Sequence, residues 1–412
     1  MPVKTPRERV KDRSAILLAY AAFILSGIGA GVNGVLLPAQ MRDYGVDRST
    51  IGITFFACAA GFTLSSLLTG TLIQRWGMRT ALVAGAAVCL VADLGMAMRP
   101  PFPVFVAMQL MSGIGIGILE SLLNVYLTHL PKATAFLNRL HAYFGVGALI
   151  GPAFGAWILR RSPWTSVYLL LALATVPLII GFRVAYSPGV PAESSPTDAP
   201  HPAGTANGKL LAALRTPAVL LASAFLAAYV GAETSVGNWG FSYLVVGRGH
   251  SDLLAGYAVS GYWLGLTLGR FLISPASDRL RLSVFAMVNG CLVGMTLSII
   301  LIWSVPAVAA SVAGLFLLGF FLGPMFPTTM AIVPTITGPE LVPTAIGILN
   351  GVSVAGTSVI PWLAGTLTQE IGMWTLAPFT ASLGVLQLVL WLRLSPGRAK
   401  NQQPMARMAA SS

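Results

Sequence analysis

Apolar runs of about 20 residues recur along almost the whole chain, and short polar segments separate them. A run of this length crosses the roughly 30 Å hydrocarbon core of a bilayer as an α-helix. Hydrophobic residues make up 55% of the chain and charged residues only 9%, whereas a soluble domain has roughly 25% charged residues. The chain is therefore expected to be a polytopic membrane protein. This excludes a soluble enzyme, a nucleic-acid-binding protein and a secreted disulfide-rich protein.

The apolar runs are continuous rather than alternating, which excludes a β-barrel and predicts an all-α membrane protein. The first run follows five basic residues, as a signal peptide would. It is too long for one and has no cleavage site, so it is expected to remain as the first span. The predicted spans are 14–40, 50–74, 80–98, 103–128, 137–160, 164–185, 216–246, 253–276, 282–304, 306–332, 342–366 and 373–394.

The distribution of Lys and Arg predicts the orientation of these twelve spans. With an even number of spans, both termini lie on one side. The loops, tails and central linker of that side hold 18 of the 25 basic residues, the opposite loops hold six, and Arg270 lies within a span. Because basic residues concentrate on the cytoplasmic side, both termini are expected to be cytoplasmic. The expected location is the plasma membrane, which is the cell inner membrane in a bacterium.

A change in composition divides the chain. Residues 187–209 are rich in Pro, Ser, Ala and Gly and predict a flexible linker that cannot build a core. The expected organisation is an N-terminal tail (1–13), a six-helix half (14–185), a cytoplasmic linker (186–215), a second six-helix half (216–394) and a C-terminal tail (395–412).

The two halves share landmarks in the same order. The segment from Gly70 to Arg75 corresponds to Ser274–Arg279 at an offset of 204, Gly113 and Gly117 to Gly319 and Gly323 at 206, and Gly147 and Pro152 to Gly356 and Pro361 at 209. Three landmarks with nearly constant offsets indicate a gene duplication. Repeated halves around a central cavity are typical of transporters.

One loop carries a recognisable motif. The segment Gly70-x-x-x-Gln74-Arg75-Trp76-Gly77-Met78-Arg79 resembles the signature G-x-x-x-D-R-x-G-R-R of the major facilitator superfamily. The resemblance implies the major facilitator fold, with two pseudo-symmetric six-helix halves. It also implies conformational gating by a set of loop and helix-end residues. The motif has an acid at the position of Gln74, and in this chain only Asp278 of the second copy supplies such an acid. The gating candidates are Gly70, Gln74, Arg75, Gly77, Arg79, Arg270, Asp278 and Arg279.

Spans 4, 5 and 7 resemble the fucose/galactose/glucose proton-symporter branch and its uncharacterised relatives. The resemblance places that branch's proton-titrating Glu on Glu120, whereas the branch's Asp in span 1 falls near Gly34. Because this acid is missing, the resemblance does not identify the substrate. A competing motif in span 5, Gly147-x-x-x-Gly151-Pro152-x-x-Gly155, resembles the antiporter motif of drug exporters.

Glu120 is the strongest candidate for a proton site. An ionised acid at the middle of a bilayer costs about 2.5–3.5 kcal/mol on insertion scales, so each acid within a span requires a reason. Gly113, Gly117, Glu120 and Asn124 share one helical face, which predicts that this face points into the protein. The alternative is a buried Glu that hydrogen-bonds to a neighbouring span.

Glu233 in span 7 is the second proton-coupling candidate. Glycines around it suggest that the helix bends or breaks there. Asn238 and Trp239 offer an amide and an aromatic face that suit a sugar, although Trp239 is equally compatible with a membrane-interface position.

The remaining polar residues within spans have two interpretations each. Asn33 and Asn350 either join helices or contact the solute, and His141 either packs or relays protons. Asp93 is interpreted as solvated or locally paired. Arg270 is interpreted as clamped to Asp278 at the cytoplasmic end, with substrate binding as the alternative. The substrate-binding candidates are Asn33, Asn124, His141, Asn238, Trp239 and Asn350.

Together these features favour a secondary transporter over an enzyme. The chain has no P-loop motif, metal-ligand spacing or nucleophile–base arrangement, so neither ATP, a metal nor any cofactor is expected. Its expected partners are a small solute, protons and the lipid bilayer, with no nucleic acid, and the chain is expected to be a monomer. The preferred function is proton symport of a small polar, sugar-like solute by alternating access. The alternatives are a proton-antiport exporter of a drug or natural product and a non-transporting sensor on the same fold.

Overall fold

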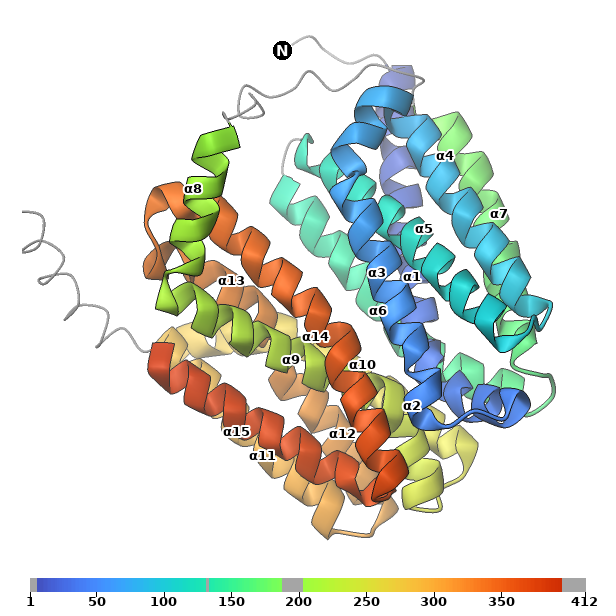
Figure 1. The fold of residues 1–412 in the computed structure, drawn as a ribbon, viewed down its shortest axis with the longest axis vertical. Helices are drawn as coiled ribbons and strands as arrows, with labels where there is room; N and C mark the ends of the chain where they lie inside the picture. Colours follow the sequence, from blue (N-terminus) through green and yellow to red (C-terminus); the bar gives the residue numbers. More distant parts are fainter. Residues whose placement is uncertain (1–5, 131–132, 187–202, 395–412) are drawn as a thin grey trace, which may run out of the picture.

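The computed structural model describes residues 6–130, 133–186 and 203–394, and within these ranges every regular element is a helix (Figure 1). The helices before the linker are α1 (Pro6–Tyr44), α2 (Arg48–Ile51), α3 (Ile53–Leu67), α4 (Thr69–Ala97), α5 (Phe102–Thr128), α6 (Ala133–Leu159) and α7 (Thr165–Ala185). After it come α8 (Ala203–Leu214), α9 (Pro217–Ser242), η2 (Tyr243–Gly247), α10 (Asp252–Arg279), α11 (Val284–Ser304), α12 (Val308–Leu322), α13 (Met325–Ile336), η3 (Pro339–Leu341), α14 (Val342–Glu370), η4 (Met373–Thr375) and α15 (Leu376–Leu394).

The all-α prediction is confirmed. Eleven stretches within the described residues are long and apolar enough to cross a membrane. Helix α10, the eighth predicted span, is not among the eleven, although its 28 residues are long enough and it packs against α6, α9 and α12. Its sequence mixes glycines, serines and charged residues with apolar ones, which makes it less apolar than a typical membrane span.

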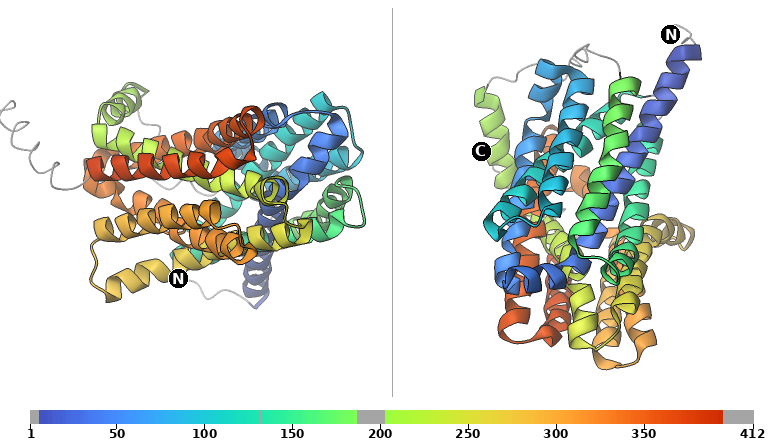
Figure 2. Two further views of the ribbon diagram at one scale, coloured as in Figure 1. Left: turned by 90° about the horizontal axis from the view of Figure 1, so that it is seen from below. Right: turned by 90° about the vertical axis from the view of Figure 1, so that its right-hand side faces the viewer.

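The helices form two groups that follow the order of the chain. Helices α1 and α3–α7 pack mainly with one another, and α9–α15 do the same (Figures 1 and 2). We call the two ends of the bundle the α2 end and the α8 end, after the helices that lie there. The two groups meet at the α2 end, and they lie apart toward the α8 end, where α1 also begins (Figure 1).

Close helix packing explains the repeated glycines. A Cβ at Gly113 in α5 would lie 2.0 Å from the Cys58 carbonyl oxygen in α3. A Cβ at Gly319 in α12 would likewise lie 2.0 Å from the Tyr262 carbonyl oxygen in α10. Cys58 and Tyr262 are themselves related by the offset of 204. The duplicated glycines therefore occupy equivalent helix crossings, where only a hydrogen in place of Cβ lets the backbones touch.

Helix α8 departs from the prediction of a flexible linker over 187–209. The predicted linker contains the start of a helix that runs from Ala203 to Leu214, and α8 packs on α9, α14 and η3. The Ala213 side chain is fully buried there. The end of this helix is rich in Leu and Ala, which have high helix propensity, and it gains an apolar contact surface. The rest of the predicted linker lies outside the described residues.

Candidate functional site

The two helix groups cross most closely between α1 and α9. The Asn33 side-chain amide donates to the Asn238 side-chain oxygen at 3.0 Å. A Cβ at Gly34 would lie 2.4 Å from the Gly237 carbonyl oxygen and 2.7 Å from that of Asn238. An aspartate at position 34, which the symporter branch would have, therefore cannot fit in this arrangement.

Two further contacts close the α2 end. Arg48 donates to the Thr368 carbonyl oxygen at 3.1 Å and to the Gln369 side-chain oxygen at 3.3 Å, which joins α2 to α14. The Ala153 backbone N–H in α6 donates to the Ser260 hydroxyl in α10 at 3.1 Å. Sequence patterns give no sign of these contacts, because each pairs residues more than 100 positions apart and carries no local motif.

The gating candidates of the signature loop do not participate in this closure. Gln74, Arg75, Asp278 and Arg279 are exposed. In the part of the chain that is described, they form no hydrogen bond or ion pair with one another. Gly77 has φ of +73°, a conformation that favours glycine, and it kinks α4 between two helical stretches. The kink explains why the motif requires a glycine at this position.

Glu233 and Arg270 form a charged pair between α9 and α10, where the Arg270 guanidinium nitrogen lies 3.6 Å from the Glu233 carboxylate. The expected clamp between Arg270 and Asp278 is therefore wrong. The helix does not break at Glu233, because α9 is continuous through it and the π-helical turn η2 begins only at Tyr243. Arg270 and Asp278 are too far apart along α10 to form the expected clamp, because eight residues of α-helix span about 12 Å.

Polar groups surround the Glu233–Arg270 pair. The Tyr262 hydroxyl donates to the Glu233 backbone oxygen at 3.1 Å. The Tyr229 hydroxyl is fully buried and lies beside both charges. His141 of α6 is exposed and interacts electrostatically with Arg270. This group, which we call the charged cluster, therefore combines residues of both helix groups.

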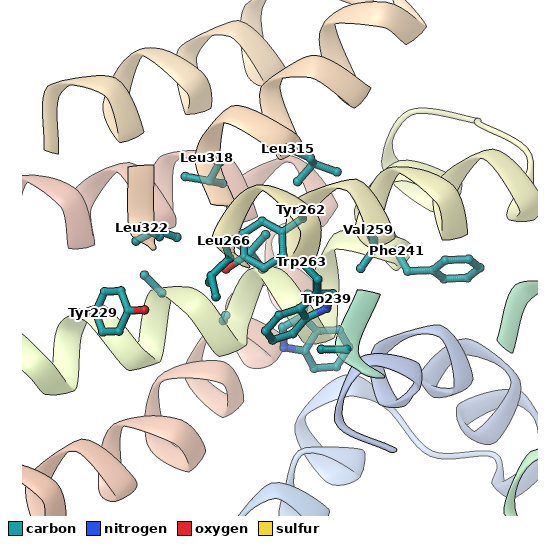
Figure 3. Close-up of a cluster of buried hydrophobic side chains, with 14 of the residues drawn as sticks. Tyr229, Trp239, Phe241, Val259, Tyr262, Trp263, Leu266, Leu315, Leu318 and Leu322 are labelled. Atoms are coloured by element: carbon teal, nitrogen blue, oxygen red, sulfur yellow. The ribbon is translucent and has the colours of Figure 1, made fainter. Parts of the chain in front are cut away.

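Trp239 is a packing residue in this structure. Its side chain is fully buried, and its indole N–H donates to the Pro361 carbonyl oxygen at 2.8 Å (Figure 3). Its ring packs edge-on against Phe55 of the other helix group. The interface-belt interpretation is therefore wrong, and the ring is not open to a solute in this conformation.

Replacing Trp239 with Ala is expected to lower the free energy of unfolding by about 3–5 kcal/mol, because a fully buried ring leaves a large cavity. Trp239→Phe is expected to cost less, mainly the hydrogen bond to Pro361. Thermal unfolding of the purified protein measures both. Trp303→Ala is the control, since this Trp is 47% exposed. Equal losses from Trp239→Ala and Trp303→Ala would contradict the packing role.

Glu120 lies apart from the charged cluster, on α5. The residue is half-buried, and none of the hydrogen bonds and ion pairs found among the described residues involves its carboxylate. The alternative interpretation, a Glu hydrogen-bonded to a neighbouring span, thus lacks support. Asn124 donates to the Glu120 backbone oxygen at 2.8 Å, one turn away on the same helix. Asn350 on α14 is exposed.

These features define a class of protein. Two groups of membrane-spanning helices meet at one end and part at the other, with buried and half-buried charges between and within them, as in transporters built from repeated halves. The family model of the Major Facilitator Superfamily matches residues 19–281 and 238–411. The chain belongs to the major facilitator superfamily, which confirms the sequence resemblance, and it is a multi-pass membrane transporter of small solutes.

Individual relatives are distant but cover most of the chain. The chain is 24% identical to Bypass of stop codon protein 6 of Saccharomyces cerevisiae, over 87% of this chain and 78% of that protein. It is 23% identical to the Glucose/mannose transporter GlcP of Bacillus subtilis, over 96% of this chain and 97% of that transporter. A similar solved structure is that of a bacterial homologue of the human lysosomal transporter Spinster, in an inward-facing and unoccupied conformation. It matches with a TM-score of 0.74 and 12% identity, over 95% of this chain and 97% of that chain.

Proposed function

We propose that this protein carries a small polar, sugar-like solute across the plasma membrane by alternating access, coupled to protons, with Glu120 as the proton site. The observation that carries the proposal is Glu120, a half-buried acid within an apolar helix bundle. Its carboxylate takes part in none of the hydrogen bonds and ion pairs found among the described residues. Maintaining an acid there is costly unless it has a task, and exchange of a proton is the task that suits it. The relation to the Glucose/mannose transporter GlcP supports a sugar-like solute.

The arrangement of the helices supports alternating access. The interactions Asn33–Asn238, Arg48–Thr368 and Ala153–Ser260 all join the two groups. Arg48 belongs to α2 itself, and Asn33 and Ala153 lie in the later parts of α1 and α6. The two groups lie apart at the α8 end (Figure 1). The distribution of basic residues favours a cytoplasmic location of the α8 end. The structure then corresponds to a conformation open to the cytoplasm, in which a monomer releases or receives its solute.

Transport into proteoliposomes tests the proposal. The purified chain is reconstituted, an inward-directed pH gradient is imposed, and uptake of radiolabelled hexoses and other hydroxylated solutes is followed. We expect accumulation above the external concentration, with collapse to equilibrium when a protonophore is added. Protein-free liposomes are the control. Equilibration of the solute that does not depend on the pH gradient would contradict proton coupling. Extrusion of the solute on the same gradient would favour the alternative function, a proton-antiport exporter.

A further inference from the structure

Helices α11 and α15 pack side by side in the second helix group (Figure 1). The Phe285 ring near the start of α11 stacks on the Trp391 ring near the end of α15, with the ring centroids 6.2 Å apart. Further along α11, a Cβ at Gly384 of α15 would lie 3.6 Å from the Thr296 hydroxyl oxygen. These two contacts show that the helices run antiparallel, and they fix how the helices are aligned.

Two amide side chains lie between these contacts. Asn289 is one helical turn after Phe285 on α11, and Gln387 is one turn before Trp391 on α15. Residues one turn apart share a face of a helix, and the two helices run in opposite directions. Asn289 therefore lies opposite the segment from Gln387 to Trp391, and both amides belong to the contact between the helices.

Three polar atoms of this contact are buried and have no hydrogen-bond partner among the described residues, namely Asn289 Oδ1, Gln387 Oε1 and Trp391 Nε1. The Gln387 side chain is fully buried, and that of Trp391 nearly so. The Gln387 Nε2 donates to the Leu383 carbonyl oxygen of its own helix at 3.2 Å, which leaves Oε1 as the atom without a partner. A buried polar atom without a partner is costly, so three of them at one helix contact indicate a bound group.

The polarity of these three atoms defines the bound group. Two of them are acceptors and one is a donor, so the group must donate two hydrogen bonds and accept one. A cation offers no acceptor to the indole N–H, and an anion offers no donor to the amide oxygens. A water molecule offers two donors and two acceptor lone pairs, and a buried water typically makes about three hydrogen bonds.

We infer that one water molecule is bound between α11 and α15, where it donates to Asn289 Oδ1 and Gln387 Oε1 and accepts a hydrogen bond from Trp391 Nε1. A bridging water is nearly as favourable in enthalpy as a direct hydrogen bond. It gives a largely apolar contact a directional link, as polar side chains do between membrane helices. This link fixes the register of α11 against α15.

A crystal or cryo-EM structure of the full chain, at a resolution that shows ordered water, tests the inference directly. We expect one density peak at about 2.7–3.2 Å from each of the three atoms. A direct hydrogen bond between the Asn289 and Gln387 amides would overturn the inference, and so would an empty space between them.

Thermal unfolding of Asn289→Leu tests it through the sign of the effect. If water is bound, the substitution removes a water-mediated hydrogen bond, and the unfolding temperature should fall. If the Asn289 oxygen has no partner at all, its replacement by an apolar group should raise the unfolding temperature. Asn138→Leu, the same substitution at an exposed position of α6, is the control and should have no effect. A rise or no change in Asn289→Leu overturns the inference.

A second substitution tests whether both amides bind the same water. Gln387→Met is expected to lower the unfolding temperature of the wild-type protein. Its effect should be smaller in the Asn289→Leu background, because the shared water is already lost there. Equal effects in the two backgrounds would overturn the shared site. None of these experiments measures transport, so the proposed function stands or fails separately.

Discussion

Glu120→Gln is expected to abolish proton-driven accumulation of the solute while leaving exchange of solute across the membrane intact. Glutamine has nearly the shape of glutamate but cannot take up or release a proton. The helix should fold normally, because the described residues show no hydrogen bond or ion pair of the carboxylate that the substitution would remove. Removal of an acid from an apolar span should leave stability unchanged or raise it.

Two assays on the same proteoliposomes separate coupling from binding. Uptake driven by a pH gradient should fall to equilibration, whereas counterflow at equal pH should continue at close to the wild-type rate. Glu340→Gln, at an exposed acid in η3, is the matched control and should accumulate normally. Normal accumulation by Glu120→Gln together with loss in Glu233→Gln would move the proton site to Glu233.

Gly34→Ala is expected to prevent the two helix groups from closing at the α2 end. A Cβ at this position would lie 2.4 Å from the Gly237 carbonyl oxygen and 2.8 Å from the Asn238 Cα, where both neighbours are backbone. Backbone cannot rotate away as a side chain can, so α1 and α9 must separate and the Asn33–Asn238 hydrogen bond is lost. Alternating access requires this closure, and transport should therefore fall by at least tenfold.

Gly29→Ala on the same helix is the matched control. A Cβ there meets nothing within 4 Å, and alanine should even favour the helix by about 0.5–1 kcal/mol. Spin labels on cysteines introduced at the exposed positions Arg42 and Glu370 report the distance across the α2 end. The distance should increase in Gly34→Ala and stay constant in Gly29→Ala. An unchanged distance in both variants would contradict the role assigned to Gly34.

The span 5 motif that resembles an exporter has a structural explanation. A Cβ at Gly147 would lie 2.0 Å from the Ile24 carbonyl oxygen of α1, and one at Gly151 would lie 2.6 Å from that of Ile28. These glycines allow α6 to touch α1 along its length. The same residues are therefore needed for packing within one half, and they give no indication of the direction of transport.

The sequence alone determined the class and the outline of the fold. Apolar runs dictate membrane helices because unpaired backbone groups cannot be left in lipid. The repeated glycines at 113 and 319 predicted duplicated halves because such close crossings leave no room for a side chain. Glu120 and Glu233 stood out because an acid in a span is rare and expensive.

Tertiary structure alone decided which polar groups meet. Arg270 pairs with Glu233 on a neighbouring helix rather than with Asp278 on its own, and Trp239 is sealed against Pro361 rather than exposed at the membrane interface. Gly34, where the sequence showed only a missing acid, is a point of backbone contact between the halves. Periodicity places a side chain on a face of its own helix, but the partner depends on how helices far apart in the chain are rotated and spaced, and only packing fixes that geometry.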